Sequence, residues 1–201
     1  MERLGVDRDK PITLQVSRFD SFKDPLGVIQ AFKMVRAHTP CKLLLVGGGA
    51  SDDPEGPRIL AEVQEAAEGD PDIQILLLHP ESHHEINALQ RAADIIVQKS
   101  VREGFGLTVT EAMWKGKPVI GGAAGGIVLQ VRDFQTGFLV HSPEGCALRI
   151  RYLLHHSEVG HRMGKQAREF VRDHFLVTRN IRDYLALMIL CDNAGDRTIA
   201  V

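Results

Sequence analysis

The chain of 201 residues lacks the features by which several large classes of protein are recognised from sequence. Its three cysteines, Cys41, Cys146 and Cys191, are scattered and form no CxxC pair, so the sequence shows neither a disulfide framework nor a zinc site. Lys and Arg number 24 against 26 Asp and Glu, a formal net charge of −2, and the two signs are interspersed. Without a basic stripe, we expect no nucleic-acid partner.

Long apolar runs are missing as well. No stretch approaches the roughly 20 apolar residues that a membrane-spanning helix needs. The charged residues 1–9 contain no apolar segment of the kind found in signal peptides. We therefore expect a cytoplasmic protein without a membrane partner.

Short apolar runs alternate with longer amphipathic segments along the whole chain. Strands are predicted at 12–17, 42–46, 73–78, 95–98, 118–121 and 138–140, and helices at 26–38, 57–67, 83–92, 107–115, 144–155, 159–174 and 178–190. Apolar strands separated by helices are typical of a parallel sheet covered on both faces. We predict the α/β fold class, with a doubly wound, Rossmann-like domain at 12–175. A linker segment at 1–11 precedes it, and a C-terminal helix and tail at 176–201 follow it.

Ligands of such sheets bind beyond the carboxyl ends of the strands, so the loops there are the candidate sites. The most informative loop is residues 99–111, which follows a predicted strand and opens a helix. Gly104 and Gly106 allow the backbone to approach a ligand closely. The free N–H groups at the helix start, near Leu107 and Thr108, form an anion site.

Two carboxylates flank this anion site. Glu103 stands at the mouth of the loop and Glu111 lies one turn inside the helix, where each can accept hydrogen bonds from hydroxyl groups. The pattern predicts a phosphate cradle between two hydroxyl acceptors. On spacing alone, a Gly-rich turn with solvated carboxylates explains the same residues equally well.

A second loop, residues 17–25, carries two cations at the end of the first predicted strand. Arg18 can bind a phosphate through two hydrogen bonds, and Lys23 can act as a point charge. Both are in the correct place for a diphosphate, although an ordinary pair of surface cations fits the loop as well.

Two further loops are rich in glycine. The run at 47–49 follows a strand but is not a dinucleotide fingerprint, because Asp52 stands where a third glycine would be needed, and no Walker A lysine follows. The loop at 121–126 could admit a sugar or phosphate, or merely turn the chain.

A metal site is not predicted. The adjacent histidine pairs at 83–84 and 155–156 do not share a helix face, and the Asp-Pro-Asp at 70–72 precedes a strand, on the wrong side of the sheet. No catalytic triad can be assembled from the sequence.

These motifs together resemble the retaining glycosyltransferases of the GT-B fold, family 4 type. Glu103 and Glu111 stand in the E-x7-E spacing of that family, within Glu-Gly-Phe-Gly-Leu-Thr-Val-Thr-Glu. The opening Val-Ser-Arg-Phe-Asp-Ser-Phe-Lys-Asp-Pro at 16–25 is similar to its donor-phosphate segment. The Trp-Lys-Gly-Lys-Pro-Val-Ile at 114–120 matches too. The resemblance covers about residues 10 to 175 and implies the second, donor-binding domain of the fold.

The segments 85–100 and 103–120 resemble more closely the trehalose-forming subgroup of the family. Leu129 stands where many relatives carry a glutamate, a variant that this subgroup shares. The resemblance implies transfer of glucose from UDP-, ADP- or GDP-glucose to a sugar acceptor, glucose itself, to give trehalose. It implies no metal requirement and a possible homodimer.

The resemblance also assigns roles residue by residue. Arg18 and Lys23 would hold the donor diphosphate, Glu103 would contact the transferred hexose, and Glu111 would bind the ribose. The other donor-binding positions that it implies are Gly47, Gly48, Gly104, Phe105, Gly106, Leu107 and Thr108.

The first GT-B domain, which supplies the acceptor site, has no counterpart in these residues. We therefore expect the isolated chain to bind a nucleotide, to transfer sugar poorly, and to expose apolar surface. The alternatives are another GT-B enzyme, with a different acceptor or epimerase activity, or a non-enzymatic nucleotide-binding module.

Overall fold

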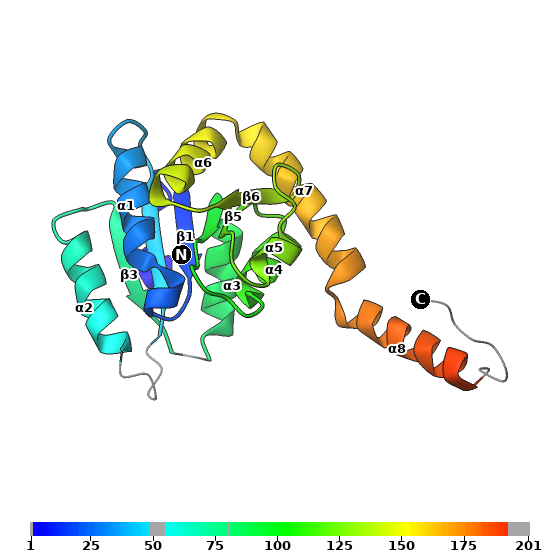
Figure 1. Cartoon of the computed structure of the whole chain (residues 1–201). Coiled ribbons are helices and arrows are strands. Elements are labelled where there is room, and N and C mark those ends of the chain that lie inside the picture. The colour runs from blue at the N-terminus through cyan, green and yellow to red at the C-terminus, as the bar shows by residue number, and fades with distance from the viewer. Residues whose placement is uncertain (1, 49–54, 80, 193–201) are drawn as a thin grey trace.

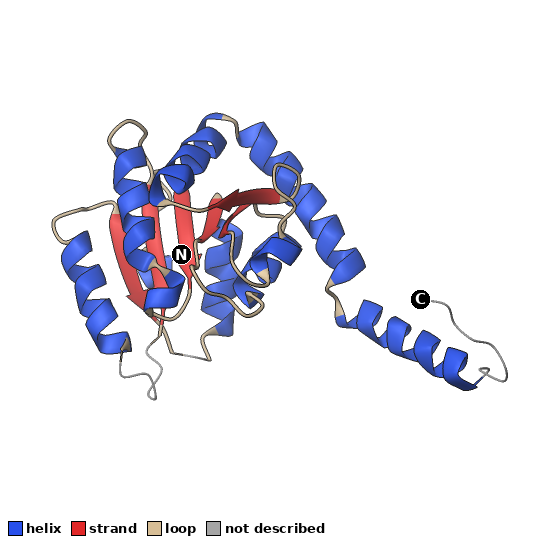
Figure 2. Ribbon diagram, viewed as in Figure 1, coloured by secondary structure: helices blue, strands red, loops and turns tan. Residues whose placement is uncertain are grey.

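A parallel sheet of six strands forms the centre of the molecule. The computed structural model describes residues 2–48, 55–79 and 81–192 (Figure 1). The strands are β1 (Ile12–Val16), β2 (Lys42–Gly47), β3 (Ile73–Leu77), β4 (Ile95–Gln98), β5 (Val119–Gly122) and β6 (Gly137–Val140). Their order in the sheet is β3-β2-β1-β4-β5-β6, and Figure 2 shows the strands in red. The chain winds outward in both directions from the β1–β4 pair, which confirms the predicted doubly wound α/β fold.

Helices cover both faces of this sheet. One face packs against α1 (Pro25–Arg36), α2 (Gly56–Ala67) and α6 (Pro143–His155), and the other against α3 (His83–Ala92), α4 (Leu107–Trp114) and α5 (Ile127–Gln130). Alternate residues of β2 supply the two cores: Leu43 and Leu45 face one, and Leu44 and Val46 face the other. The long helix α7 (Ser157–His174) contributes to both.

The segment before β1 packs against the domain. It begins with the 3-10 helix η1 (Glu2–Leu4), Val6 is buried, and Leu4 contacts the core that lies under α3 and α4. Lys10 adds an ion pair with Asp72. Residues 2–11 are thus part of the packed structure, while the domain limits at 11 and 175 stay a prediction.

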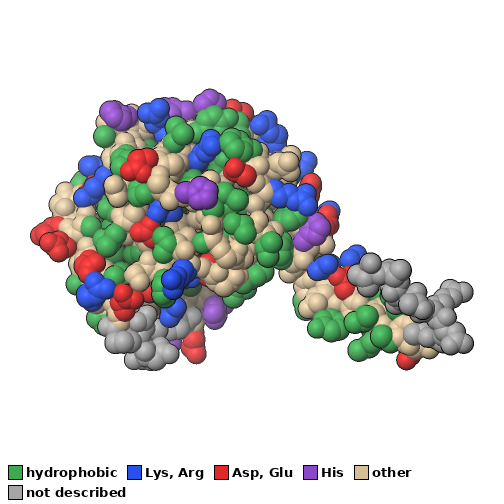
Figure 3. Space-filling view, viewed as in Figure 1, with side chains coloured by type: hydrophobic (Ala, Val, Ile, Leu, Met, Phe, Trp, Pro, Cys, Tyr) green, Lys and Arg blue, Asp and Glu red, His purple; other side chains and the backbone are tan. Residues whose placement is uncertain are grey.

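The last helix, α8 (Val177–Asp192), extends away from the sheet (Figure 1) and none of its residues is buried. Its apolar side chains are more than half exposed, and many lie on the projecting part of the surface in Figure 3. They include Ile181, Leu185, Met188 and Ile189. The predicted exposure of apolar surface is therefore seen here.

Three short elements were not predicted. The 3-10 helix η1 lies before β1, and the 3-10 helix η2 (Ser21–Lys23) and the four-residue helix α5 lie in loops after β1 and β5. All three are too short to show a hydrophobic period. The remaining predicted elements are present, with ends that differ by one or two residues.

Candidate functional site

The loops that follow β1 and β4 meet where the strand order reverses. The two strands are neighbours, with Leu14 opposite Ile96, so their carboxyl ends lie at the switch point at which doubly wound sheets bind ligands. Across this point the Lys23 ammonium lies 2.6 Å from the Glu103 carboxylate. Both side chains are largely shielded, at 17% and 10% exposure. Two predicted site residues from different loops are thus brought into contact.

Lys23 is held by its backbone as well as by its side chain. Asp20 caps η2 by accepting a hydrogen bond from the Lys23 N–H at 3.0 Å. The buried Gln15 side chain donates to the Lys23 carbonyl at 2.9 Å. The next residue, Asp24, has a φ of 48°, caps α1 and pairs with the buried Lys99. The turn therefore presents the Lys23 ammonium from a fixed position.

Glu103 is held from the β4 side. The Ser100 hydroxyl donates to the carboxylate at 3.2 Å, and the Gln98 amide donates to Ser100 at 3.1 Å. Both of these supporting residues are buried. Ser100 and Gln98 were not predicted as site residues, because their role depends on where the loop turns.

Arg18 lies at the rim of the same site. Its side chain is 57% exposed, and its guanidinium lies 3.2 Å from the buried Asp20 carboxylate. The guanidinium is thus exposed to solvent on one side and paired with a buried carboxylate on the other. Arg18 borders a hollow of about 310 Å³ that is lined by Arg18, Asp20, Phe22, Lys23, Arg102, Glu103 and Gly104.

Arg102 is a third cation in this hollow that the sequence did not single out. Its guanidinium lies over the Phe22 ring, 5.4 Å from the ring centroid. The neighbouring Val101 N–H donates to the Phe22 carbonyl at 2.8 Å, which joins the two loops. Three cations against two carboxylates give the hollow a surplus of positive charge, which favours an anionic ligand.

The Gly-rich loop leads from this hollow into α4. Gly106 precedes the helix with a φ of 89°, a left-handed conformation that glycine adopts without strain. The Val109 N–H donates back to the Gly106 carbonyl at 3.0 Å. The N–H groups of Leu107 and Thr108 come before that bond, in the first turn, where a helix leaves its donors unsatisfied. The anion site at Leu107 and Thr108 stays a prediction.

The side chains of this loop point elsewhere. Leu107 is 68% exposed, and the Phe105 ring packs edge to face against Phe175, with centroids 5.8 Å apart. Neither residue lines the hollow. Gly104 has open space around its α-carbon, so a ligand can approach it.

Glu111 does not line the hollow. Its carboxylate accepts a hydrogen bond from the buried Gln90 on α3 at 3.2 Å, and Gln90 accepts one from Lys115 at 2.6 Å. Burial lowers the pKa of Lys115, an effect that the nearby Glu111 charge opposes. Glu103 and Glu111 therefore have separate sets of partners.

Gly47 and Gly48 occupy the end of β2. A β-carbon at Gly47 would lie 2.0 Å from the Ser17 carbonyl oxygen, so only glycine lets β2 and the Arg18 loop approach this closely. Gly48 is half-buried. Residues 49–54, including Asp52, lie outside the described part of the chain.

The loop after β5 packs against the Glu103 loop. A β-carbon at Gly125 would lie 1.6 Å from the Glu103 carbonyl oxygen, and one at Gly122 would lie 2.1 Å from the Ser100 carbonyl oxygen. Beside them lies a hollow of about 190 Å³, lined by Lys99, Ser100, Val101, Gly122, Ala123, Ala124, Val140 and His141. The glycines at 121–126 thus both turn the chain and border a space next to the cation-lined hollow.

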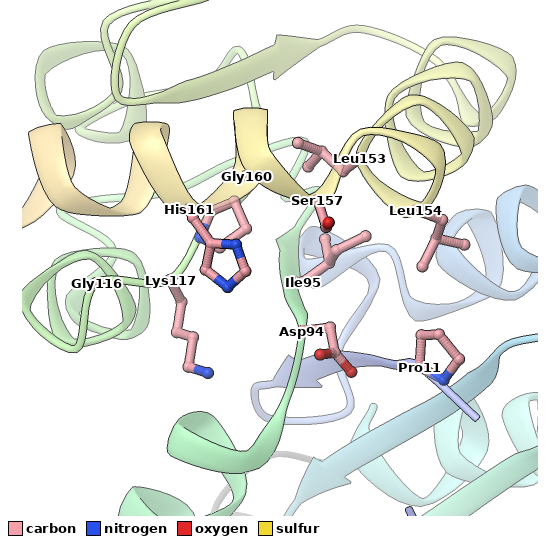
Figure 4. A pocket seen from close by; sticks show the side chains of 11 residues that line it. Pro11, Asp94, Ile95, Gly116, Lys117, Leu153, Leu154, Ser157, Gly160 and His161 are labelled. Carbon is pink, nitrogen blue, oxygen red and sulfur yellow. The ribbon is translucent and has the colours of Figure 1, made fainter. Parts of the chain in front are cut away.

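Another hollow, of about 150 Å³, lies at the opposite edge of the sheet (Figure 4). Asp94, Lys117 and His161 border it, and Asp94 accepts a hydrogen bond from the Ile12 N–H at 2.8 Å. Burial lowers the pKa of Lys117. We place the candidate site at the carboxyl edge because loops converge there, whereas this hollow lies where strands begin.

Within residues 2–48, 55–79 and 81–192, no group of three or more His, Cys, Asp or Glu residues could hold a metal ion. The Asp-Pro-Asp at 70–72 precedes β3 as predicted, and both carboxylates form ion pairs with Arg36, at 3.0 and 3.1 Å. In the same ranges no helix is both long and apolar enough to cross a membrane.

The fold and the cation-lined switch point define an α/β domain of the GT-B glycosyltransferase type. Residues 1–170 match the family model of the Glycosyl transferases group 1. The chain therefore belongs to the group 1 glycosyltransferase family.

Individual relatives agree with this assignment. The chain is 47% identical over 190 residues to a trehalose synthase of Pyrococcus horikoshii, covering 94% of this chain and 46% of that protein. A sucrose-phosphate synthase from Thermosynechococcus elongatus has a similar structure, with a TM-score of 0.78, 30% identity, and coverage of 96% of this chain and 48% of that one.

The Anabaena protein Alr3699/HepE, determined in complex with UDP and glucose, shares the fold with a TM-score of 0.79 at 22% identity. The match covers 94% of this chain and 51% of that one. The chain thus spans about half the length of the curated relatives it matches.

Proposed function

We propose that this chain is the donor-binding half of a retaining glucosyltransferase that takes glucose from a nucleoside-diphosphate glucose. The observation that carries the proposal is the contact of Lys23 with Glu103 at the switch point, beside Arg18. These are the family's expected donor groups, and they meet from loops that are 80 residues apart in the chain.

In the proposed reaction, Arg18 and Lys23 bind the diphosphate of the donor. When the bond between C1 of glucose and the diphosphate oxygen breaks, its electron pair leaves with the diphosphate. The added negative charge is stabilised by the two cations and by the N–H groups of Leu107 and Thr108. Because side chains and backbone dipoles supply this positive charge, we propose no metal cofactor.

Retention follows if the acceptor hydroxyl attacks C1 from the face that the diphosphate leaves, through an oxocarbenium-like state. The bond from the acceptor oxygen to C1 then replaces the broken bond, and the hydroxyl proton passes to the departing diphosphate oxygen. Glu103 then contacts the hexose together with the backbone of residues 104–106, and Glu111 accepts hydrogen bonds from the ribose hydroxyls. Gly47 and Gly48 line the nucleotide side. Glu103 and Glu111 have separate partners in the structure, so in this proposal each binds a different part of the donor.

We propose glucose as the acceptor and trehalose as the product. This rests on the 47% identity to a trehalose synthase. The UDP and glucose bound to the Anabaena protein support a nucleotide-sugar donor. The acceptor site would lie in the half of the relatives that the chain does not span, and α8, with its exposed apolar side chains, is the surface we propose to contact that half.

Calorimetric titration tests the donor site. UDP, ADP, GDP and their glucose conjugates are titrated into the chain, and then into Arg18→Ala and Glu111→Ala. We expect one base to be preferred and both substitutions to weaken its binding. Glu62→Gln, which breaks only an exposed pair on α2, is the matched control. Absence of binding, or binding indifferent to both substitutions, would refute the assignment.

A further inference from the structure

The β5–α5 segment bonds two successive carbonyl groups of the Gly-rich loop. The Gly126 N–H donates to the Gly104 carbonyl at 2.9 Å. The Gln130 side-chain amide donates to the Phe105 carbonyl. In Figure 1 the short helix α5 lies beside α4, which brings these donors to the loop.

The Gln130 amide is fixed in one orientation. Its oxygen accepts a hydrogen bond from the Thr110 hydroxyl at 2.9 Å, and its nitrogen faces the Phe105 carbonyl. The reverse orientation would place two carbonyl oxygens against each other, and neither can donate. Gln130 is fully buried, so water does not replace either partner.

These bonds determine where the loop's N–H groups point. None of the described peptide bonds is cis, and in a trans peptide the N–H points opposite to the carbonyl of the same unit. The carbonyl groups of Gly104 and Phe105 face the β5–α5 segment. The N–H groups of Phe105 and Gly106, which share those peptide units, therefore point away from it.

Those two N–H groups have no acceptor among the described residues. In the chain they are followed directly by the free N–H groups of Leu107 and Thr108 at the start of α4. Gly106, with its left-handed φ of 89°, lies at the turn between the two pairs of N–H groups. Successive N–H groups in such a turn form a concave donor surface. Four consecutive N–H groups thus have no acceptor in the described part of the chain, and Gly106 itself is buried.

We infer that Gln130 is a positioning residue, which turns the Phe105 and Gly106 N–H groups toward the hexose of the bound donor. This inference rests on the proposed function. The helix-start donors at Leu107 and Thr108 serve the diphosphate and do not depend on Gln130. Gln130 therefore affects recognition of the sugar and leaves recognition of the nucleotide largely unchanged.

The test compares the dissociation constants of UDP and UDP-glucose, or of the ADP or GDP pair if the chain prefers that base. Gln130→Met keeps the length of the side chain but removes both hydrogen bonds. We expect it to weaken UDP-glucose binding about tenfold, the size of effect that the loss of one or two hydrogen bonds produces. UDP binding should weaken by less than twofold, because UDP lacks the hexose that the Phe105 and Gly106 N–H groups would contact. Thr110→Val, which removes only the bond to the Gln130 oxygen, should shift the ratio in the same direction by a smaller amount.

Amide hydrogen exchange gives a second readout. In the wild-type chain, UDP-glucose should slow exchange at Phe105 and Gly106 beyond the effect of UDP, and in Gln130→Met this difference should vanish. Equal weakening of UDP and UDP-glucose binding, or an unchanged ratio of their dissociation constants in a folded variant, would overturn the positioning role of Gln130. Failure of the wild-type chain to bind any of the nucleotides would instead overturn the proposed function.

Discussion

The ammonium of Lys23 and the carboxylate of Glu103 lie 2.6 Å apart at the point where the strand order of the sheet reverses. In the free chain each charge is compensated by the other. A diphosphate that enters the hollow must share Lys23 with Glu103, so the two residues should affect nucleotide affinity in opposite directions.

The first prediction uses this opposition. Glu103→Gln removes the charge that competes for Lys23, so the dissociation constant for UDP, or for the preferred diphosphate, should fall about threefold to tenfold. Lys23→Met removes a charge-assisted bond and should raise it by about tenfold or more. Calorimetry on both variants and on the Glu62→Gln control checks the signs. Changes in the same direction would contradict the pairing.

The second prediction contrasts two glycines, Gly125 and Gly104, in loops that pack against each other. A side chain at Gly125 would collide with the Glu103 carbonyl, and its φ of 49° is already left-handed. Gly125→Ala should therefore lower the free energy of unfolding by about 2 kcal/mol or more. Gly104→Ala has open space and should change it by about 0.5 kcal/mol or less. Denaturant unfolding measures both, and equal effects would refute the packing described.

The third prediction concerns stability in acid. Hydrogen bonds from Lys10 and then Arg36 lower the pKa of Asp72, whose side chain is 10% exposed. A carboxylate with a lowered folded pKa contributes stability above its unfolded value of 3.8, and this contribution is lost as pH falls through the folded value.

Asp72→Asn should therefore cost about 1–3 kcal/mol at pH 7 and progressively less below pH of about 4. Denaturant unfolding of the wild type and the variant across this range measures the difference. A difference that stays constant down to pH of about 2 would contradict the role given to Asp72.

The fourth prediction concerns the thiols. Burial raises the pKa of Cys41 to about 11 and of Cys146 to about 12, whereas Cys191 is exposed on α8. At pH of about 8 a thiol reagent should label one cysteine quickly in the native chain and all three after unfolding. Cys191→Ser should remove the fast reaction. Rapid labelling of Cys41 or Cys146 in the native chain would show that the core packing is wrong.

The strands could be predicted because each appears in the sequence as a short apolar run, and all of them except the edge strand β3 are almost entirely buried. Helix α5 could not, because four residues after a Gly-rich loop show no period. The role of its buried residue Gln130 could be inferred only from the structure, which shows its two partners. They are Thr110 on α4 and the Phe105 carbonyl in the loop before α4.

The candidate site was predictable in part. Loop positions after strands indicated Arg18, Lys23 and Glu103, but their proximity depends on the order β1-β4, which the sequence does not state. Arg102 was missed for the same reason, since its contact with Phe22 joins loops that are distant in the chain. The orientation of Glu111 toward Gln90 likewise depends on how α3 packs beside α4.

The most direct test of the donor site is to follow the backbone amide signals of the chain by NMR while UDP, or the preferred nucleoside diphosphate, is added. The account predicts that the largest shifts fall on residues 17–24 and 103–108, and that Arg18→Ala diminishes them. Shifts concentrated around Lys117 and His161 at the opposite edge, or no saturable shifts with UDP, ADP or GDP, would contradict it.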